Sequence, residues 1–279
     1  MASKQQFVII KKYDGKLNLV NELARLIERN YSELFHSVIV HGSVATNEVI
    51  PYSDFDGLLI VRDDFVTSKR LQKFKSESMK LILEFDPLQH HGWFQIKESK
   101  LNNYPESYLP VTTLEHSKLI YPIVDSLSFH LKISDNIDYK RSLVGILTQF
   151  EKRIQNNWKP SNIFELKSIL SQIMLIPCLY YSAIYNRGIF KRESFEAVKI
   201  NFTEQEWKPI KIASQVRKDW DKELNFFQSF LLKQTNTLLR KIIRKYVAPR
   251  INSKTKEKLN SEFYSNLNKL IQKIKIEIQ

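Results

Sequence analysis

The sequence has little of several features that mark special classes of protein. Its 279 residues include one cysteine, six glycines and nine prolines, and no segment repeats at a fixed period. Low glycine and proline exclude collagen-like and low-complexity chains, and the missing period excludes solenoids. With 43% hydrophobic and 26% charged residues, the chain can bury one large core or two modest ones. We therefore predict a globular, helix-rich protein.

The single cysteine and the lack of long apolar runs indicate the compartment. Cys178 excludes a disulfide framework and a thiolate metal cluster, and it fits a reducing environment. The N-terminal residues lack the apolar core, of about 7 to 15 residues, that a secretory signal has. The longest uncharged stretch, residues 168–186, contains Pro177 and several polar side chains, which favours a kinked core helix over a membrane span. We expect a cytoplasmic protein with no membrane contact.

Positive charge is in excess and is concentrated at the C-terminal end. Lys plus Arg is 43 and Asp plus Glu is 30, so the net charge is 43 − 30 = +13. Residues 233–279 hold twelve basic and three acidic residues, so 12 − 3 = +9 of the total lies there. Such a surplus attracts phosphates, nucleotides or nucleic acid. We expect a nucleotide partner and keep RNA as a second partner for this basic region, with a solvated basic helix face as the alternative.

Hydrophobic periodicity divides the chain into two regions. The first region mixes helical and strand patterns, which is typical of an α+β domain with a mixed sheet. From residue 126 the pattern is almost entirely helical and indicates a bundle. We predict an α+β N-terminal domain over 1–125 and an all-α helical bundle domain over 126–279, with the change of pattern between 125 and 138. The elements expected are helices at 17–35 and 68–85, strands at 38–40, 54–61 and 92–97, a strand-like stretch ending at Tyr121, and helical stripes at 139–154, 163–185, 212–231 and 259–274.

The most informative stretch is VIVHGSVATNEVIPYSDFDGLLIV, residues 38–61. One strand ends on Gly42-Ser43, ten residues follow, and a second strand opens with Asp54-Phe55-Asp56. Strand side chains alternate, so both aspartates project from one face. Two carboxylates suit Mg²⁺, which prefers one or two carboxylates together with substrate phosphate oxygens and water. A purely local turn before a strand is the alternative explanation of this pattern.

The strand-terminal Gly42-Ser43 complements the two acids. Glycine lets a phosphate approach the backbone where a Cβ would collide, and serine adds a hydroxyl and an N–H that bind phosphate oxygens. A metal held by the acids would activate an acceptor hydroxyl and neutralise charge at phosphorus, after which pyrophosphate leaves. The pattern predicts an Mg²⁺-dependent enzyme that uses ATP or another nucleoside triphosphate.

These residues carry a family resemblance. Gly42-Ser43, ten residues and Asp54-x-Asp56 resemble the signature of the DNA polymerase β-like nucleotidyltransferase superfamily. The sequence GSVATNEVIPYSDFD, residues 42–56, is similar to that of aminoglycoside adenylyltransferases of the streptomycin and spectinomycin type. A second segment, LYYSAIYNRGIFKRESFEA at 179–197, resembles part of the helical domain of those enzymes.

The resemblance implies a catalytic domain with the polymerase β-like fold, a helical substrate-binding domain and a cleft between them. It implies that Gly42 and Ser43 contact phosphates and that Asp54 and Asp56 bind Mg²⁺ in a two-metal site. It further implies that Lys191 or Arg192 holds the triphosphate, because Arg192-Glu193 occupies the place of a Lys-acid pair in the second segment. A solvated loop charge is the alternative for those two basic residues.

The sequence departs from the family in one place. The family usually supplies a third carboxylate on the strand that here reads HHGWFQI, residues 90–96, and this strand has no acid. Either Asp86 reaches the metals from the strand entry, or a histidine substitutes as ligand or base, or the site has lost its chemistry. Asp86 and His91 are therefore our further catalytic candidates.

Three functions follow from these observations. The first is transfer of a nucleoside monophosphate, AMP from ATP, to a hydroxyl of a small molecule such as an aminoglycoside-like compound. The second keeps the chemistry but uses RNA or protein as acceptor. The third is a nucleotide-binding regulator without turnover. The sequence indicates neither the acceptor nor the oligomeric state.

Overall fold

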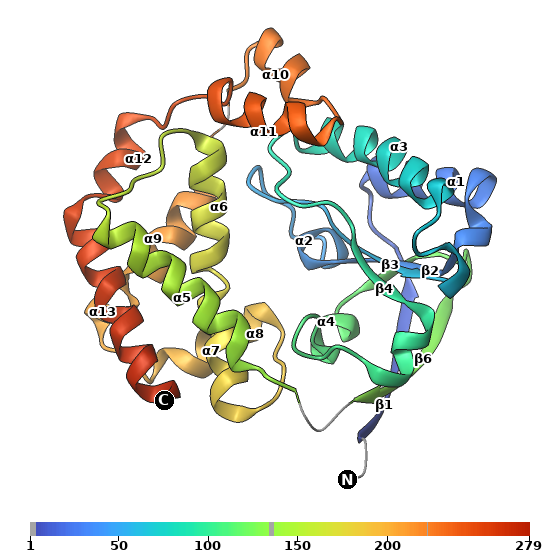
Figure 1. The fold of residues 1–279 in the computed structure, drawn as a ribbon, viewed down its shortest axis with the longest axis horizontal. Helices are drawn as coiled ribbons and strands as arrows, with labels where there is room; N and C mark the ends of the chain where they lie inside the picture. The colour runs from blue at the N-terminus through green and yellow to red at the C-terminus, as the bar shows by residue number, and fades with distance from the viewer. Residues whose placement is uncertain (1–3, 134–136, 222) are drawn as a thin grey trace. The chain divides into compact units, whose positions relative to one another are not determined.

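A computed structural model describes residues 4–133, 137–221 and 223–279. The chain divides into two compact units, which we call the sheet unit and the helical unit (Figure 1). The sheet unit comprises Met1–Asn136 and Leu224–Val247, and the helical unit comprises Ile137–Glu223 and Ala248–Gln279. The observed division differs from the predicted one: the first stretch extends beyond residue 125, and a later segment returns to it. Residues 134–136, inside the region where we expected the change, lie outside the described residues.

The sheet unit is built on one six-stranded mixed sheet, which confirms the predicted mixed sheet with helices. The strand order is β4-β3-β2-β5-β1-β6. β1 with β5 and β3 with β4 are parallel pairs, whereas β1 with β6, β2 with β3 and β2 with β5 are antiparallel. The strands are β1 Lys4–Lys12, β2 Phe35–His41, β3 Asp56–Val61, β4 Phe94–Lys97, β5 Lys118–Tyr121 and β6 Ser126–Ile133.

β6 explains why the sheet unit extends past residue 125. It pairs with β1 along its whole length, from Lys4 opposite Ile133 to Lys11 opposite Ser126. The sequence pattern predicted neither strand, and residues 126–133 were assigned to the helical domain. Antiparallel pairing of two strands over this length ties β6 to the sheet, because its backbone groups are satisfied there.

The core of the sheet unit lies between the sheet and two long helices (Figure 1). α1 and α3 pack side by side and bury Leu23 and Ile27 from α1 and Phe74 from α3 against Val38 and Val40 of β2. Ser68 caps α3, because its hydroxyl accepts a hydrogen bond from the amide of Leu71 at 3.1 Å. The helices formed by residues before 136 are α1 Asn18–Asn30, α2 Gly42–Ala45, α3 Lys69–Phe85 and α4 Val111–Glu115, with single 3-10 turns at Ser32–Leu34, Asp63–Phe65 and Glu98–Asn103.

Residues 224–247, which we call the return segment, form α10 Phe226–Leu232 and α11 Thr237–Tyr246. They belong to the sheet unit although they follow most of the helical unit in sequence. Lys233, after α10, forms an ion pair with Glu84 of α3. The prediction of one helix over 212–231 is wrong, because α9 ends at Lys218 and α10 begins only at Phe226.

The described part of the helical unit contains helices and their connections. α13 packs against α5, α7 and α9 and buries Leu267, Leu270 and Ile271. α13 is anchored by its charged face as well, since Lys275 lies 2.8 Å from Glu151 of α5. The helices are α5 Lys140–Gln155, α6 Ile163–Ile173, α7 Ile176–Tyr185, α8 Lys191–Lys199, α9 Glu204–Lys218, α12 Ser253–Lys258 and α13 Ser261–Ile278.

The uncharged stretch that raised the question of a membrane helix forms α6 and α7, with Pro177 in the first turn of α7. Among the described residues, Ile163–Tyr185 is the one stretch long and apolar enough to cross a membrane, and 56% of its apolar window is buried within the fold. Two consecutive core helices, such as α6 and α7, can together be as long and as apolar as a membrane-spanning helix.

Candidate active site

The Gly42-Ser43 turn lies directly against Asp56. β2 ends at His41, which pairs with Asp56 across the β2–β3 register. Gly42 follows with φ of +65°, and a Cβ built on it would lie 2.7 Å from Oδ2 of Asp56. Only glycine tolerates both the left-handed backbone and this approach. The absence of a side chain at this residue therefore lets the turn pack directly against the Asp56 carboxylate.

Asp54 and Asp56 flank a residue that anchors them in the core. β3 begins at Asp56, so Asp54 precedes the strand that we expected it to open. Phe55 points inward, where its ring packs edge-on against Trp93 at 5.2 Å. Because adjacent side chains in extended backbone alternate, the two carboxylates face away from the core. They are close enough to interact, since the charge of Asp54 acts to raise the pKa of Asp56.

Each aspartate has a histidine from the segment before β4. Nδ1 of His90 lies 3.7 Å from Oδ1 of Asp54, and Nε2 of His91 lies 3.2 Å from Oδ1 of Asp56. Nδ1 of His91 also lies 3.2 Å from the Gly92 carbonyl oxygen. A carbonyl and an ionised carboxylate only accept hydrogen bonds, so the two ring nitrogens of His91 both face acceptors, an arrangement that favours the protonated ring.

The electrostatics agree with this assignment. Burial alone would lower the pKa of His91, but its hydrogen bond to Asp56 and the charges of both aspartates raise it above the ordinary value. Burial alone would raise the pKa of Asp56, but the hydrogen bond from His91 and the nearby His41 hold it below its ordinary value. Asp56 is therefore ionised at neutral pH, as a metal ligand must be.

His41 lies behind the acid pair. It is buried, and burial lowers its pKa. Its Nε2 has no hydrogen-bond partner within residues 4–133, 137–221 and 223–279. Phe94 lies close to the rings of both His41 and His91, at 5.4 and 5.0 Å between centroids. Trp93, next to it in sequence, instead packs against the core.

The side chain of Gln89 holds the backbone between the two aspartates. It is completely buried. Its Oε1 accepts a hydrogen bond from the Phe55 amide at 2.9 Å, and its Nε2 donates to the Phe55 carbonyl at 2.8 Å and to the His91 carbonyl at 3.1 Å. This amide occupies both hydrogen-bonding groups of Phe55 as a neighbouring strand would. We call the arrangement the Gln89 clamp; no pattern in the sequence indicated it.

Two arginines of α11 bind the backbone of the clamp. The Gln89 carbonyl accepts hydrogen bonds from Nη2 of Arg240, at 3.2 Å, and from Nη2 of Arg244. Burial, together with the like charge of Arg240, lowers the pKa of Arg244 to about 10, while the charges of Asp86 and Asp54 act in the opposite direction. From the sequence, both arginines were counted only as part of the basic C-terminal region.

Asp86 lies with the arginines. It is completely buried at the end of α3, and its Oδ1 accepts a hydrogen bond from the Leu88 amide at 3.2 Å. Its charge acts on Arg240 and Arg244. Of the two residues considered in place of a third carboxylate, His91 is the one hydrogen-bonded to Asp56.

The residues present fit a magnesium ion that shares its ligands with a substrate. Within the described residues, no group of three or more His, Cys, Asp or Glu side chains is arranged to hold a metal. The two carboxylates would therefore be the protein's contribution, and phosphate oxygens and water would complete the coordination, which is the usual pattern for Mg²⁺. Gly42, where a Cβ would collide with Oδ2 of Asp56, places the Gly42-Ser43 turn beside this carboxylate.

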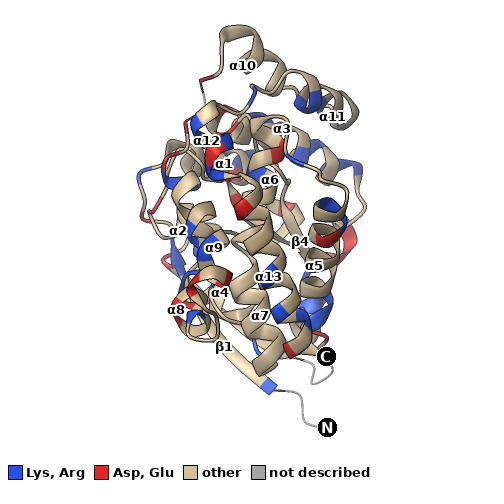
Figure 2. Cartoon of the chain, turned by 90° about the vertical axis from the view of Figure 1, so that its left-hand side faces the viewer, with Lys and Arg blue, Asp and Glu red and all other residues tan. Residues whose placement is uncertain are grey.

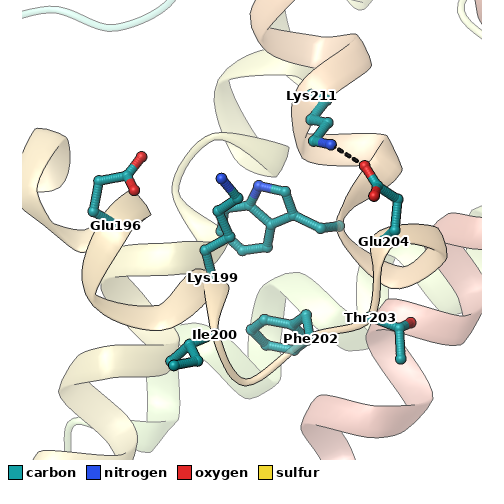
Figure 3. A pocket seen from close by; sticks show the side chains of 8 residues that line it. Glu196, Lys199, Ile200, Phe202, Thr203, Glu204 and Lys211 are labelled. Atoms are coloured by element: carbon teal, nitrogen blue, oxygen red, sulfur yellow. Dashed lines mark hydrogen bonds and ion pairs between the residues drawn. The ribbon is translucent and has the colours of Figure 1, made fainter.

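Lys191 and Arg192 lie in the helical unit, in the first turn of α8. Their role in binding a triphosphate stays a prediction. A surface hollow of about 430 Å³ lies between α8 and α9, and in it Lys211 forms an ion pair with Glu204 (Figure 3). It contains none of the predicted site residues. It is lined by Glu196, Lys199, Ile200, Phe202, Thr203, Glu204, Trp207 and Lys211.

The basic C-terminal region is divided between the two units. α11 belongs to the sheet unit, whereas α12 and α13 belong to the helical unit, and each carries Lys or Arg residues (Figure 2). Several of these charges are engaged within their own unit: Lys258 lies 2.8 Å from Asp219, and Lys273 lies 3.0 Å from Glu277. RNA binding by this region stays a prediction.

No protein-family model and no curated protein matches the chain. Among solved structures, the chain is similar to one described as spectinomycin adenyltransferase AAD(9) from Enterococcus faecialis with ATP and spectinomycin. The similarity covers 84% of this chain and 99% of that chain, with 12% sequence identity and a TM-score of 0.41.

Proposed function

We propose that the chain is an Mg²⁺-dependent nucleotidyltransferase that moves a nucleoside monophosphate, AMP from ATP, to a hydroxyl of a small molecule. The observation that carries this proposal is the approach of the Gly42 turn to the Asp56 carboxylate, beside Asp54. The turn that would contact phosphate oxygens thus lies against the carboxylate that would hold the metal. A metal shared between the protein and a phosphate needs these two groups side by side.

The protein's residues have separate tasks in this reaction. Asp54 and Asp56 would hold Mg²⁺, which supplies charge neutralisation at the phosphates and activation of the acceptor. Gly42 and Ser43 would contact phosphate oxygens from the turn. The acceptor oxygen forms a bond to the α-phosphorus, and the bond from that phosphorus to the oxygen that bridges it to the β-phosphorus breaks. Pyrophosphate leaves with that oxygen, and the proton of the acceptor hydroxyl passes to water. His91 would hold the Asp56 carboxylate in place through its Nε2, which lies 3.2 Å from Oδ1 of that residue.

An aminoglycoside-like acceptor is proposed because the sequence GSVATNEVIPYSDFD is similar to sequences of enzymes that act on such compounds. The base and the acceptor are not selected by Asp54, Asp56 or the turn, because these groups bind only the metal and the phosphates common to all nucleoside triphosphates. The identity of both substrates is therefore left to experiment.

The test is release of pyrophosphate and incorporation of labelled nucleotide, with each of the four nucleoside triphosphates, Mg²⁺ or Mn²⁺, and separate panels of small molecules and RNA. Wild type is compared with Asp56→Asn. Asp63→Asn is the matched control, since Asp63 is an exposed aspartate that binds Ser99 and lies outside the site. We expect Asp56-dependent label on a small molecule, with Asp63→Asn as active as wild type.

Two other outcomes are informative. Label on RNA alone would favour the alternative acceptor. Nucleotide binding with no Asp56-dependent turnover on any acceptor would contradict the transferase and favour a nucleotide-binding regulator.

A further inference from the structure

The return segment makes a specific connection to the acid pair. Arg240 and Arg244 donate to the carbonyl of Gln89, and the side chain of Gln89 binds both backbone groups of Phe55, between Asp54 and Asp56. Four hydrogen bonds thus link α11 to the segment that carries the two carboxylates. All of these groups belong to the sheet unit.

We propose that Arg240 and Arg244 are positioning residues that, through the Gln89 clamp, hold Asp54 and Asp56 in the geometry that binds the metal. This inference rests on the proposed function for the presence of a metal. It extends that function by giving the return segment a task in the site.

The clamp supports the backbone just ahead of β3. That strand begins at Asp56, so Phe55 precedes it. The Gln89 amide binds both backbone groups of Phe55. The same amide binds the carbonyl of His91, whose ring binds Asp56. Movement of Gln89 would therefore displace both carboxylates and the histidine together.

The arginines fix the clamp at its backbone. Gln89 follows the end of α3 by four residues, in a segment whose local bonds are the turn from Gln89 to Asp86 and the bond from Leu88 to Asp86. Two guanidinium groups on one carbonyl oxygen hold this segment against α11. Charged donors form stronger hydrogen bonds than neutral ones. Both arginines are largely buried, and burial lowers the pKa of each, so this contact is made at a cost in desolvation.

Two variants separate positioning from simple electrostatics. Arg240→Met with Arg244→Met removes the donors and keeps much of the side-chain volume. Gln89→Glu keeps the acceptor for the Phe55 amide and removes the donors to the Phe55 and His91 carbonyls. Both changes make the surroundings of Asp54 more negative, so charge alone would tighten the binding of a divalent cation. If the arginines act by positioning, displacement of Asp54 and Asp56 would instead weaken the binding of that cation.

The measurement is the affinity of the full chain for Mn²⁺, in the absence of nucleotide, from the spectroscopic signal of free Mn²⁺. We expect both variants to bind Mn²⁺ about 10-fold or more weakly than wild type, as for other groups that orient metal ligands. We expect kcat to fall more than KM for the nucleotide changes. Arg240→Lys with Arg244→Lys should restore part of the affinity, since lysine also donates to a carbonyl.

Lys233→Met is the matched control. It removes one positive charge from the return segment and breaks its ion pair with Glu84, but it leaves the Gln89 clamp intact. We expect its Mn²⁺ affinity to equal that of wild type. Circular dichroism and thermal unfolding of every variant show whether the fold is retained. If the double arginine variant does not fold, the Mn²⁺ affinity of Gln89→Glu by itself tests the inference.

Mn²⁺ affinity that is unchanged or higher in Gln89→Glu would overturn the inference. So would a higher KM for the nucleotide in the arginine variant with unchanged Mn²⁺ affinity, because that result assigns the arginines to direct phosphate binding. Failure of the proposed function is distinguished by wild type itself, which would then show no Mn²⁺ binding that depends on Asp54.

Discussion

Replacing Gly42 by alanine tests whether the turn and the acid pair form one site. Two independent costs follow from the structure. The backbone of Gly42 has φ of +65°, and a residue with a Cβ pays roughly 1–2 kcal/mol in this region. The new Cβ would also lie 2.7 Å from Oδ2 of Asp56, whereas ordinary contact begins at 3.4 Å, so the carboxylate or the turn must move by 3.4 − 2.7 = 0.7 Å.

These costs predict a modest loss of stability and a large loss of activity. We expect the free energy of unfolding to fall by about 1–3 kcal/mol. A displacement of the order of 1 Å at a catalytic group lowers the rate by about 100-fold, and we expect kcat/KM for pyrophosphate release to fall by roughly that factor. Binding of Mn²⁺ should weaken in parallel, because Asp56 is one of the two proposed metal ligands.

The assay is steady-state pyrophosphate release together with urea unfolding, with Gly145→Ala as the control. Gly145 lies in α5 of the helical unit, and a Cβ there would meet no atom within 4 Å. The control variant should keep full activity. If Gly42→Ala transfers nucleotide as fast as wild type, then Asp56 does not act in the geometry described, and the turn is not part of the site.

Three other results are expected. Asp54→Asn and Asp56→Asn should each lower the rate of nucleotide transfer by about 100-fold or more, and calorimetry should show weaker Mn²⁺ binding. If either variant keeps the wild-type turnover, the proposed metal site is contradicted. Gly145→Ala should raise the free energy of unfolding by about 0.5–1 kcal/mol, since alanine replaces glycine inside a helix without a clash, and a decrease would show that the residue is constrained in some other way. Burial and the hydrogen bond to Glu77 raise the pKa of Tyr31 to about 12, so its contribution to stability is complete below about pH 10 and declines as the pH rises toward 12. Between about pH 8 and pH 11, the free energy of unfolding in urea should therefore fall less for Tyr31→Phe than for wild type. An equal fall in both proteins would contradict the shift in pKa.

The helices and strands that were predicted well have hydrophobic patterns that can be recognised locally, without knowing which distant segment they pack against or pair with. α1 and α3 have apolar stripes at helical spacing, and β2 and β3 are short apolar runs buried on both faces. β1 was missed because its apolar residues 7–10 are consecutive, and only the structure shows that Phe7 and Ile9 are exposed while Val8 and Ile10 are buried. Its partner β6 lies more than a hundred residues later, where the surrounding pattern is helical.

The same distinction applies to the site. Gly42, Ser43, Asp54 and Asp56 were predicted because their chemical types and their short spacing are visible in fifteen consecutive residues. Gln89 was not, since a glutamine has no characteristic chemistry and its contact with Phe55 spans 34 residues. Arg240 and Arg244 contact Gln89 across 151 and 155 residues, and in a region with many basic residues nothing in their spacing marks them.

These observations separate two kinds of information in the chain. The residues that would do the chemistry are close together in sequence and are recognisable by type. The residues that fix their positions come from distant segments, and their side chains are recognisable only by burial and by the groups they bind. Net charge illustrates the difference: the charge of residues 233–279 predicted either an RNA partner or a solvated basic helix face. In the fold, Arg240, which is buried, and Arg244, which is partly buried, donate to one backbone carbonyl. Burying cations is costly, and the charge of Asp86 acts against that cost at both arginines. The carbonyl that these arginines bind belongs to the residue that holds the acid pair in place.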